Sequence, residues 1–256
     1  MAPGNDSVFG GVDGCKGGWV AIWLALSIDR SQVKVYPAFS DVVSDAKTRA
    51  ASLVLADIPI GLPDSGGPYA RACDLAARRI MGRCAPRVFP APSRSVLEAT
   101  DYADACMINR EAIGKALSKQ TWALVPKIAE VDRILLGCPS LQACIRETHP
   151  EVCFAALKRW KPVAASKKTS EGQSQRRSLL KEKVPDCDEL VEEAVRRFRG
   201  RLEVDDVIDA LVAALSARLA SGAEFPALPL KGEYDLRGLR MEMVVPAHPP
   251  GAGTVT

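Results

Sequence analysis

Two kinds of residue that often build metal and catalytic sites are scarce or poorly placed in this sequence. There are only two histidines, His149 and His248, and none of the eight cysteines is spaced as a Cys-x-x-Cys pair. Zinc sites usually depend on such pairs and on histidine. The sequence therefore argues against a zinc site, and we expect the cysteines to be small buried side chains.

The sequence also lacks the long apolar run of a membrane-spanning helix. The longest such stretch extends from Trp19 to Ile28, about half the length that a bilayer span requires. The N-terminal residues MAPGNDSVFGG contain neither the basic region nor the apolar region of a secretory signal. We therefore expect a cytoplasmic protein without a membrane partner, whose thiols stay reduced.

The composition is that of an ordinary globular protein. Apolar residues make up 47% of the 256 residues and charged residues 25%, a balance that does not favour disordered or fibrous classes. A chain of this length can bury one sizeable core. We expect a single domain over residues 8–245 with a helical insertion at about 61–143, followed by a disordered tail at 246–256.

The order of apolar runs and turn signals predicts an α/β fold. Three β-rich runs come first, a helix begins near Ser40, and two further β-rich runs follow. The expected strands are residues 8–13, 19–27, 33–36, 52–57 and 143–148. Three meandering strands followed by a crossover through a helix predict a mixed five-stranded sheet flanked by helices.

Residues 61–143 have the character of helices and irregular loops. A helix is expected from Pro68 to Gly82, because proline favours a first helical position and glycine favours the position after a helix. Asp74 in this helix lies three residues after Arg71 and four before Arg78. This spacing predicts ion pairs on the surface of the helix.

Four aspartates lie at the ends of apolar elements and not on exposed faces. Asp13 ends the first expected strand, Asp57 ends the fourth, and Asp206 and Asp209 lie in the first turns of the last long helix. A carboxylate beside buried apolar residues is unfavourable unless it is paired, capped or bound to a cation. Because Asp206 and Asp209 are three residues apart, they project from the same side of the helix and can act on one ion.

Carboxylates without a histidine or thiolate partner suit a hard cation such as Mg²⁺ or Mn²⁺. Such a site favours phosphoryl chemistry, in which two ions about 4 Å apart activate a water and stabilise the leaving oxygen. Each aspartate also has a local interpretation: Asp13 in an Asp-Gly turn, Asp57 in a turn, and Asp205 or Asp206 as a helix cap. Their joint occurrence in this order of elements favours the metal site.

A basic segment interrupts an otherwise slightly acidic chain. Residues 158–183 contain nine basic and two acidic residues, a net charge of +7, which leaves −4 for the rest of the chain. This distribution predicts contact with a nucleic acid, with Lys167, Lys168 and Arg176 on its phosphates. A solvated loop is the alternative.

Two further residues have two interpretations each. Glu147, at the end of the fifth expected strand, either joins the carboxylate cluster as a metal ligand or pairs with Lys167 or Lys168. His149 is either a structural histidine, which is the commoner case, or a base.

Seven motifs follow one another along most of the chain, namely GVDGCKGGW, ADIPIGLP, RACDLAARR, VFPAPSR, ETHPEVCF, KKTSEG and DDVIDAL. Together they resemble the DUF429 family of predicted nucleases with a ribonuclease H-like fold. The DDVIDAL motif is also similar to the last helix of Holliday-junction resolvases of the same superfamily. The resemblance implies that Asp13, Asp57, Asp206 and Asp209 are the metal ligands.

Three functions agree with these observations. The first is a metal-dependent nuclease or related phosphodiester hydrolase. The second is a nucleotide-binding phosphotransferase, because Asp13, Gly14 and Lys16 also resemble the first phosphate loop of the actin and sugar-kinase superfamily. Such kinases usually enclose the nucleotide between two domains, whereas this sequence indicates one. The third is a non-catalytic nucleic-acid-binding module that keeps the fold alone.

Overall fold

The computed structural model describes residues 7–25, 31–221 and 225–249. Most of the predicted tail, residues 250–256, lies outside this part of the chain. The strands are β1 (Val8–Cys15), β2 (Gly18–Ala25), β3 (Gln32–Tyr36), β4 (Leu53–Ala56), β5 (Ile145–Glu147), β6 (Ala227–Tyr234) and β7 (Arg240–Val244). The α-helices are α1 (Phe39–Thr48), α2 (Ala72–Met81), α3 (Tyr102–Ile113), α4 (Lys119–Gly137), α5 (Pro150–Leu157), α6 (Ser170–Lys181), α7 (Cys187–Arg197) and α8 (Val204–Leu219).

Five of the strands form the expected mixed sheet, in the order β3-β2-β1-β4-β5. Strands β1, β2 and β3 are antiparallel neighbours, whereas β4 pairs parallel with both β1 and β5. The predicted α/β fold is confirmed, and the strand order and directions agree with a ribonuclease H-like sheet. The hairpin turn lies at Lys16 and Gly17, so Asp13 belongs to the β1 ladder opposite Val20 and not to an Asp-Gly turn.

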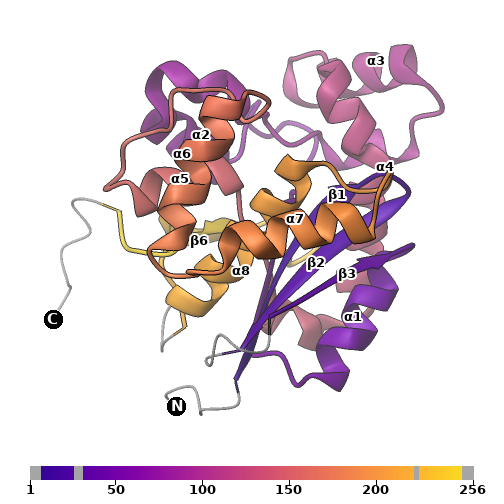
Figure 1. Ribbon diagram of the computed structural model, residues 1–256. Helices are drawn as coiled ribbons and strands as arrows, with labels where there is room; N and C mark the ends of the chain where they lie inside the picture. Colours follow the sequence, from indigo (N-terminus) through magenta and orange to yellow (C-terminus); the bar gives the residue numbers. More distant parts are fainter. Residues whose placement is uncertain (1–6, 26–30, 222–224, 250–256) are drawn as a thin grey trace, which may run out of the picture.

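Helices cover both faces of this sheet. On one face α1 and α4 pack against the side chains of Val12, Trp19 and Ala56. On the other face α5, α6, α7 and α8 pack against Val20 and Ile22. Figure 1 shows α7 crossing in front of β2 and β3, with α1 beside β3.

Strand alternation directs two of the aspartates toward α8. Successive side chains of a strand point to opposite faces. Val12 and Ala56 face α1 and α4, so Asp13 and Asp57, which directly follow them, face α8. Helix α8 can pack directly on β1 because Gly11 of β1 has no side chain. A Cβ on Gly11 would lie 2.0 Å from the Ala214 nitrogen.

The segment 61–143, all of which the structure describes, contains α2, α3 and α4 and no strand. Its last helix, α4, packs through Ile128, Val131 and Leu135 into the core under the sheet. Its first helix, α2, packs instead on a small second sheet formed by β6 and β7. Strand β6 was not predicted, because the residues after Pro229 are mostly polar and lack a strand pattern. They form a strand by pairing with β7.

The first helix of this segment does not begin where the sequence predicted. It starts at Ala72 and not at Pro68, with Arg71 as its N-cap. The reason is the side chain of Asp74, whose Oδ2 accepts the amide of Arg71 at 3.2 Å and so fixes the first turn. The end of the helix at Gly82 is confirmed.

Candidate metal centre

Three of the four predicted aspartates converge at one edge of the sheet. Asp13 comes from β1, Asp57 follows β4, and Asp209 comes from the second turn of α8. One carboxylate oxygen from each residue lies within 4.8 Å of the corresponding oxygens of the other two. The parallel pairing of β1 with β4 aligns the first two aspartates, since the amide of Asp57 donates to the carbonyl of Val12 at 2.9 Å.

A lysine side chain enters this cluster from the loop before α6. The ammonium of Lys167 donates a short hydrogen bond to Asp209 Oδ2 and lies 3.8 Å from Asp205 Oδ2. Burial alone would lower the pKa of Lys167, but the carboxylates of Asp209 and Asp13 raise it above its ordinary value. The lysine therefore stays charged, and it supplies a positive charge to a strongly acidic site.

The carboxylates themselves have raised pKa values. Burial raises the pKa of Asp13 well above its ordinary value, and the nearby Asp57 and Asp209 raise it further. Burial also raises the pKa of Asp57, against the opposing charges of His149 and Lys167. The pKa of Asp209 rises to about 7, mainly because its side chain is buried. One ammonium thus compensates this cluster only in part.

The donor set fits a divalent cation that prefers oxygen ligands. All three groups are carboxylates, and neither a thiol nor an imidazole belongs to the cluster. Asp209 is 1% exposed, and its Oδ1 accepts no hydrogen bond from any residue that the structure describes. A buried acceptor normally has a partner. This free oxygen and the ammonium of Lys167 both mark the cluster as a place where positive charge is stabilised.

The fourth predicted ligand, Asp206, has a different position. Its Oδ2 accepts the amide of Glu203 at 2.9 Å and so caps the start of α8. Asp206 still lines the same cavity, and its charge raises the pKa of Asp13. The local interpretation of Asp206 as a capping residue therefore describes its hydrogen bond, while its charge adds to the acidic site.

Glu147 is not part of the aspartate cluster, and its partner is Arg71 and neither Lys167 nor Lys168. Two hydrogen bonds of 2.7 Å join the Arg71 guanidinium to the two carboxylate oxygens of Glu147. The same guanidinium binds Asp74 at 2.7 Å, and all three side chains are buried. The predicted surface ion pairs of Asp74 are therefore wrong: Arg71 is its buried partner, and Arg78 binds backbone carbonyls instead.

Only one of the three predicted phosphate contacts lies in the aspartate cluster. Lys168 donates to Asp205 at 2.9 Å, beside the cluster. Arg176 is 0% exposed and binds Glu151 through two nitrogens, at 2.9 and 2.6 Å. A buried arginine paired in this way cannot reach a phosphate on the surface, so Arg176 is a structural residue.

A cavity of about 530 Å³ opens onto the aspartate cluster. Its lining includes His149, whose Nδ1 is buried without a hydrogen bond to any described residue. It also includes Lys127, which the sequence did not single out; its ammonium donates to the carbonyl of Gly18 and lies 4.3 Å from the centroid of the Trp19 ring. Burial lowers the pKa of Lys127.

No helix in the described ranges is long and apolar enough to cross a membrane.

A family model described as a protein of unknown function, DUF429, matches residues 11–230. The chain belongs to the DUF429 family. The DUF429 match includes the three clustered aspartates and Lys167. No curated protein and no solved structure matches the chain significantly.

Proposed function

We propose that this DUF429 protein is a divalent-metal-dependent phosphodiester hydrolase that acts on nucleic acid. The observation that carries the proposal is the convergence of Asp13, Asp57 and Asp209 within 4.8 Å at one end of a ribonuclease H-like sheet. The three residues would hold Mg²⁺ or Mn²⁺, since both prefer carboxylate oxygens. A divalent cation at such a site supplies an activated water and stabilises charge on a phosphoryl oxygen.

The residues around the cluster support an anionic substrate. Lys167 carries a charge directly at the carboxylates, and Lys127 lies on the cavity wall. These cations would bind the non-bridging oxygens of a phosphodiester while the aspartates hold the metal. The cavity volume of about 530 Å³ lies within the range of small-molecule and cofactor sites. It therefore has room for part of a nucleic-acid strand.

The cytoplasm is the compartment that we propose. All eight cysteines are free thiols in the structure, a state that a reducing compartment maintains.

The experiment is a cleavage assay over a panel of single-stranded DNA, duplex DNA, duplex RNA, RNA–DNA hybrid and branched DNA. With Mg²⁺ or Mn²⁺ we expect cleavage of at least one substrate, and none in chelator. Asp13→Asn should abolish cleavage without altering the circular dichroism spectrum. Asp41→Asn is the matched control, because Asp41 is an exposed residue in the first turn of α1.

Two results would contradict the proposal. One is the absence of metal-dependent turnover across the whole panel. The other is cleavage that survives Asp13→Asn, which would place the reaction elsewhere in the molecule. A non-catalytic binding module would show the first result and would keep its nucleic-acid affinity in chelator.

A further inference from the structure

Four arginines lie within six residues at the end of α7 and in the loop that leads to α8. They form the arginine loop, residues 196–201, which contains Arg196, Arg197, Arg199 and Arg201. All four side chains are exposed. None forms an ion pair with a carboxylate in the part of the chain that the structure describes.

The basic segment 158–183 differs from the arginine loop because acidic neighbours neutralise much of it. Lys167 and Lys168 pair with aspartates of α8. Arg176 is buried on Glu151, and two further cations pair with Asp188 of α7. Five of its nine basic residues are therefore already paired within the protein. The arginine loop is the denser source of uncompensated charge.

The arginine loop borders the metal centre. Only Leu202 and Glu203 separate Arg201 from α8, the helix that carries Asp209. Asp13 and Asp209 line the cavity of about 530 Å³. Asp206, five residues after Arg201, lines this cavity as well. The start of α8, which directly follows the loop, therefore forms part of the cavity wall at the aspartate cluster.

A second hollow lies under the loop, with a volume of about 340 Å³. Its apolar lining comes from valines of α7 and α8, namely Val191, Val195 and Val204. Its charged lining consists of Arg196 and Arg199 together with Arg177 and Glu192, which pair with each other at 3.6 Å. Guanidinium groups over an apolar floor match a nucleotide, whose phosphate is anionic and whose base and sugar have apolar faces.

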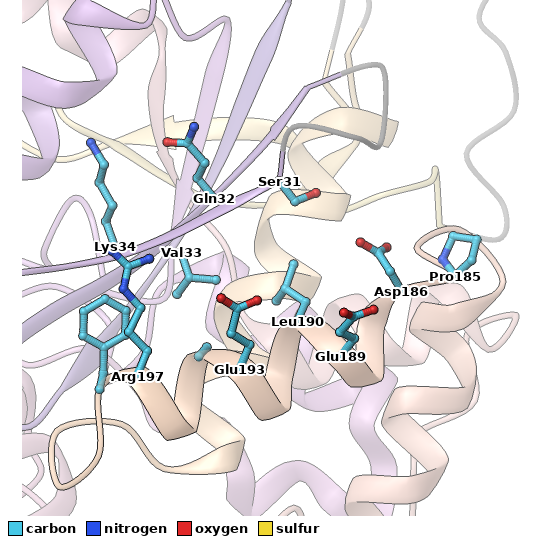
Figure 2. Close-up of a pocket in the computed structure, with 12 residues that line it drawn as sticks. Ser31, Gln32, Val33, Lys34, Pro185, Asp186, Glu189, Leu190, Glu193 and Arg197 are labelled. Atoms are coloured by element: carbon cyan, nitrogen blue, oxygen red, sulfur yellow. The ribbon is translucent and has the colours of Figure 1, made fainter.

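The rest of α7 carries the opposite charge. Figure 2 shows Glu189 and Glu193 of α7 in a groove against strand β3, with Asp186 at the start of the helix. The groove has a volume of about 740 Å³, and its lining also includes Lys34 and Arg197. Cations in a last helical turn also stabilise the helix dipole. That effect explains Arg196 and Arg197, but Arg199 and Arg201 lie beyond the end of α7.

We propose that the arginine loop binds the phosphate backbone of the nucleic acid and presents one phosphodiester to the aspartate cluster. The assignment rests on the proposed function and places the main electrostatic contact at residues 196–201, not at 158–183. Charge complementarity and the apolar floor of the hollow under the loop favour nucleic acid over other anionic partners.

The test is fluorescence anisotropy in chelator, so that no cleavage occurs, with fluorescein-labelled DNA duplex, its single strand and the matching RNA–DNA hybrid. The variant is R196Q/R199Q/R201Q. Each phosphate contact contributes about 0.9 to the slope of log affinity against log salt. We therefore expect the slope to fall by about 2.7 and Kd to rise at least about tenfold near 0.1 M salt.

The matched control is K158Q/R159Q/K161Q, which removes three exposed charges from the basic segment. This control should leave Kd close to that of the unmodified protein. The conservative variant R196K/R199K/R201K should keep the salt slope, which separates a charge effect from a loss of structure. Circular dichroism and thermal unfolding verify that every variant is folded.

The proposal is overturned if the unmodified protein binds none of the three probes. It is also overturned if only the control variant loses affinity, or if both variants bind as the unmodified protein does. Arginine-dependent binding to phosphatidylserine vesicles without binding to nucleic acid would assign the loop to a lipid surface. Loss of affinity in the arginine variant without metal-dependent cleavage in the unmodified protein would sustain the arginine loop and reject the hydrolase. Cleavage that requires Asp13, with normal binding by the arginine variant, would sustain the hydrolase and reject the arginine loop as the binding site.

Discussion

Replacing Asp209 by asparagine should stabilise the metal-free protein at neutral pH. The carboxylate is 1% exposed, and burial raises its pKa from 3.8 to about 7 even though Lys167 is beside it. At about 1.4 kcal/mol for each tenfold change in the acid dissociation constant, the charged form costs the folded protein about 4 kcal/mol. Asparagine has almost the same shape and removes this cost.

The pH dependence follows from the direction of the shift. Between pH 4 and 7 the folded protein keeps the proton of Asp209, whereas the unfolded chain has lost it. The stability of the unmodified protein therefore falls as pH rises through this range. We expect Asp209→Asn to match the unmodified protein near pH 4 and to be more stable by about 4 kcal/mol at pH 8.

Urea unfolding in chelator at several pH values measures this difference. Repeating the series with Mn²⁺ should stabilise the unmodified protein, by about 2.7 kcal/mol at a hundredfold excess over Kd, and Asp209→Asn much less. Asp74→Asn is the control, since Asp74 is equally buried but paired with Arg71. It should lose about 3 kcal/mol because the buried guanidinium of Arg71 loses one of its two carboxylate partners and keeps only Glu147.

Destabilisation by Asp209→Asn throughout this pH range, with no effect of Mn²⁺ on the unmodified protein, would refute an uncompensated carboxylate at this site. The three aspartates and Lys167 would then form a structural ion-pair network, as Arg71, Asp74 and Glu147 do.

Two further variants test the parts that build the site. Lys167→Met removes the ammonium from the cluster; it should lower the stability of the metal-free protein at pH 8 by about 2 kcal/mol and enlarge the stabilisation by Mn²⁺ in thermal unfolding. An unchanged response to Mn²⁺ would show that the lysine and the metal do not share the site. Gly11→Ala would place its Cβ 2.0 Å from the Ala214 nitrogen, so urea unfolding should show a loss of about 3 kcal/mol or more. Gly137→Ala, where a Cβ meets no other atom within 4 Å, is its control; equal losses in the two variants would refute the close packing of α8 on β1.

The sequence predicted the sheet because each central strand is a continuous apolar run with a polar end. The same property located Asp13 and Asp57, since each follows a buried residue that fixes which face it points to. The position of Asp209 followed from the apolar stripe of α8. What the sequence did not decide is the choice between Asp206 and Asp209, because both project from one side of the helix and only the cap on Glu203 separates them.

Long-range pairing explains most of what the sequence did not reveal. An aspartate three residues after an arginine has the same spacing on a surface helix and in a core. Arg71 is buried because its guanidinium binds Glu147, which is 76 residues away in the sequence. Arg176 lies in a basic segment, and this context predicted a phosphate contact. The structure shows that Arg176 is paired with Glu151 instead. The four arginines of residues 196–201 do not depend on long-range pairing. Four arginines within six residues could have indicated an anion-binding surface from the sequence alone.

The central claim is that Asp13, Asp57 and Asp209 bind a divalent cation. Anomalous diffraction from crystals grown with saturating Mn²⁺ tests it most directly. We predict an anomalous peak about 2.1 Å from oxygens of these carboxylates, with the Lys167 ammonium moved away from Asp209. Density for that ammonium still hydrogen-bonded to Asp209, with no manganese among the three carboxylates, would contradict the claim.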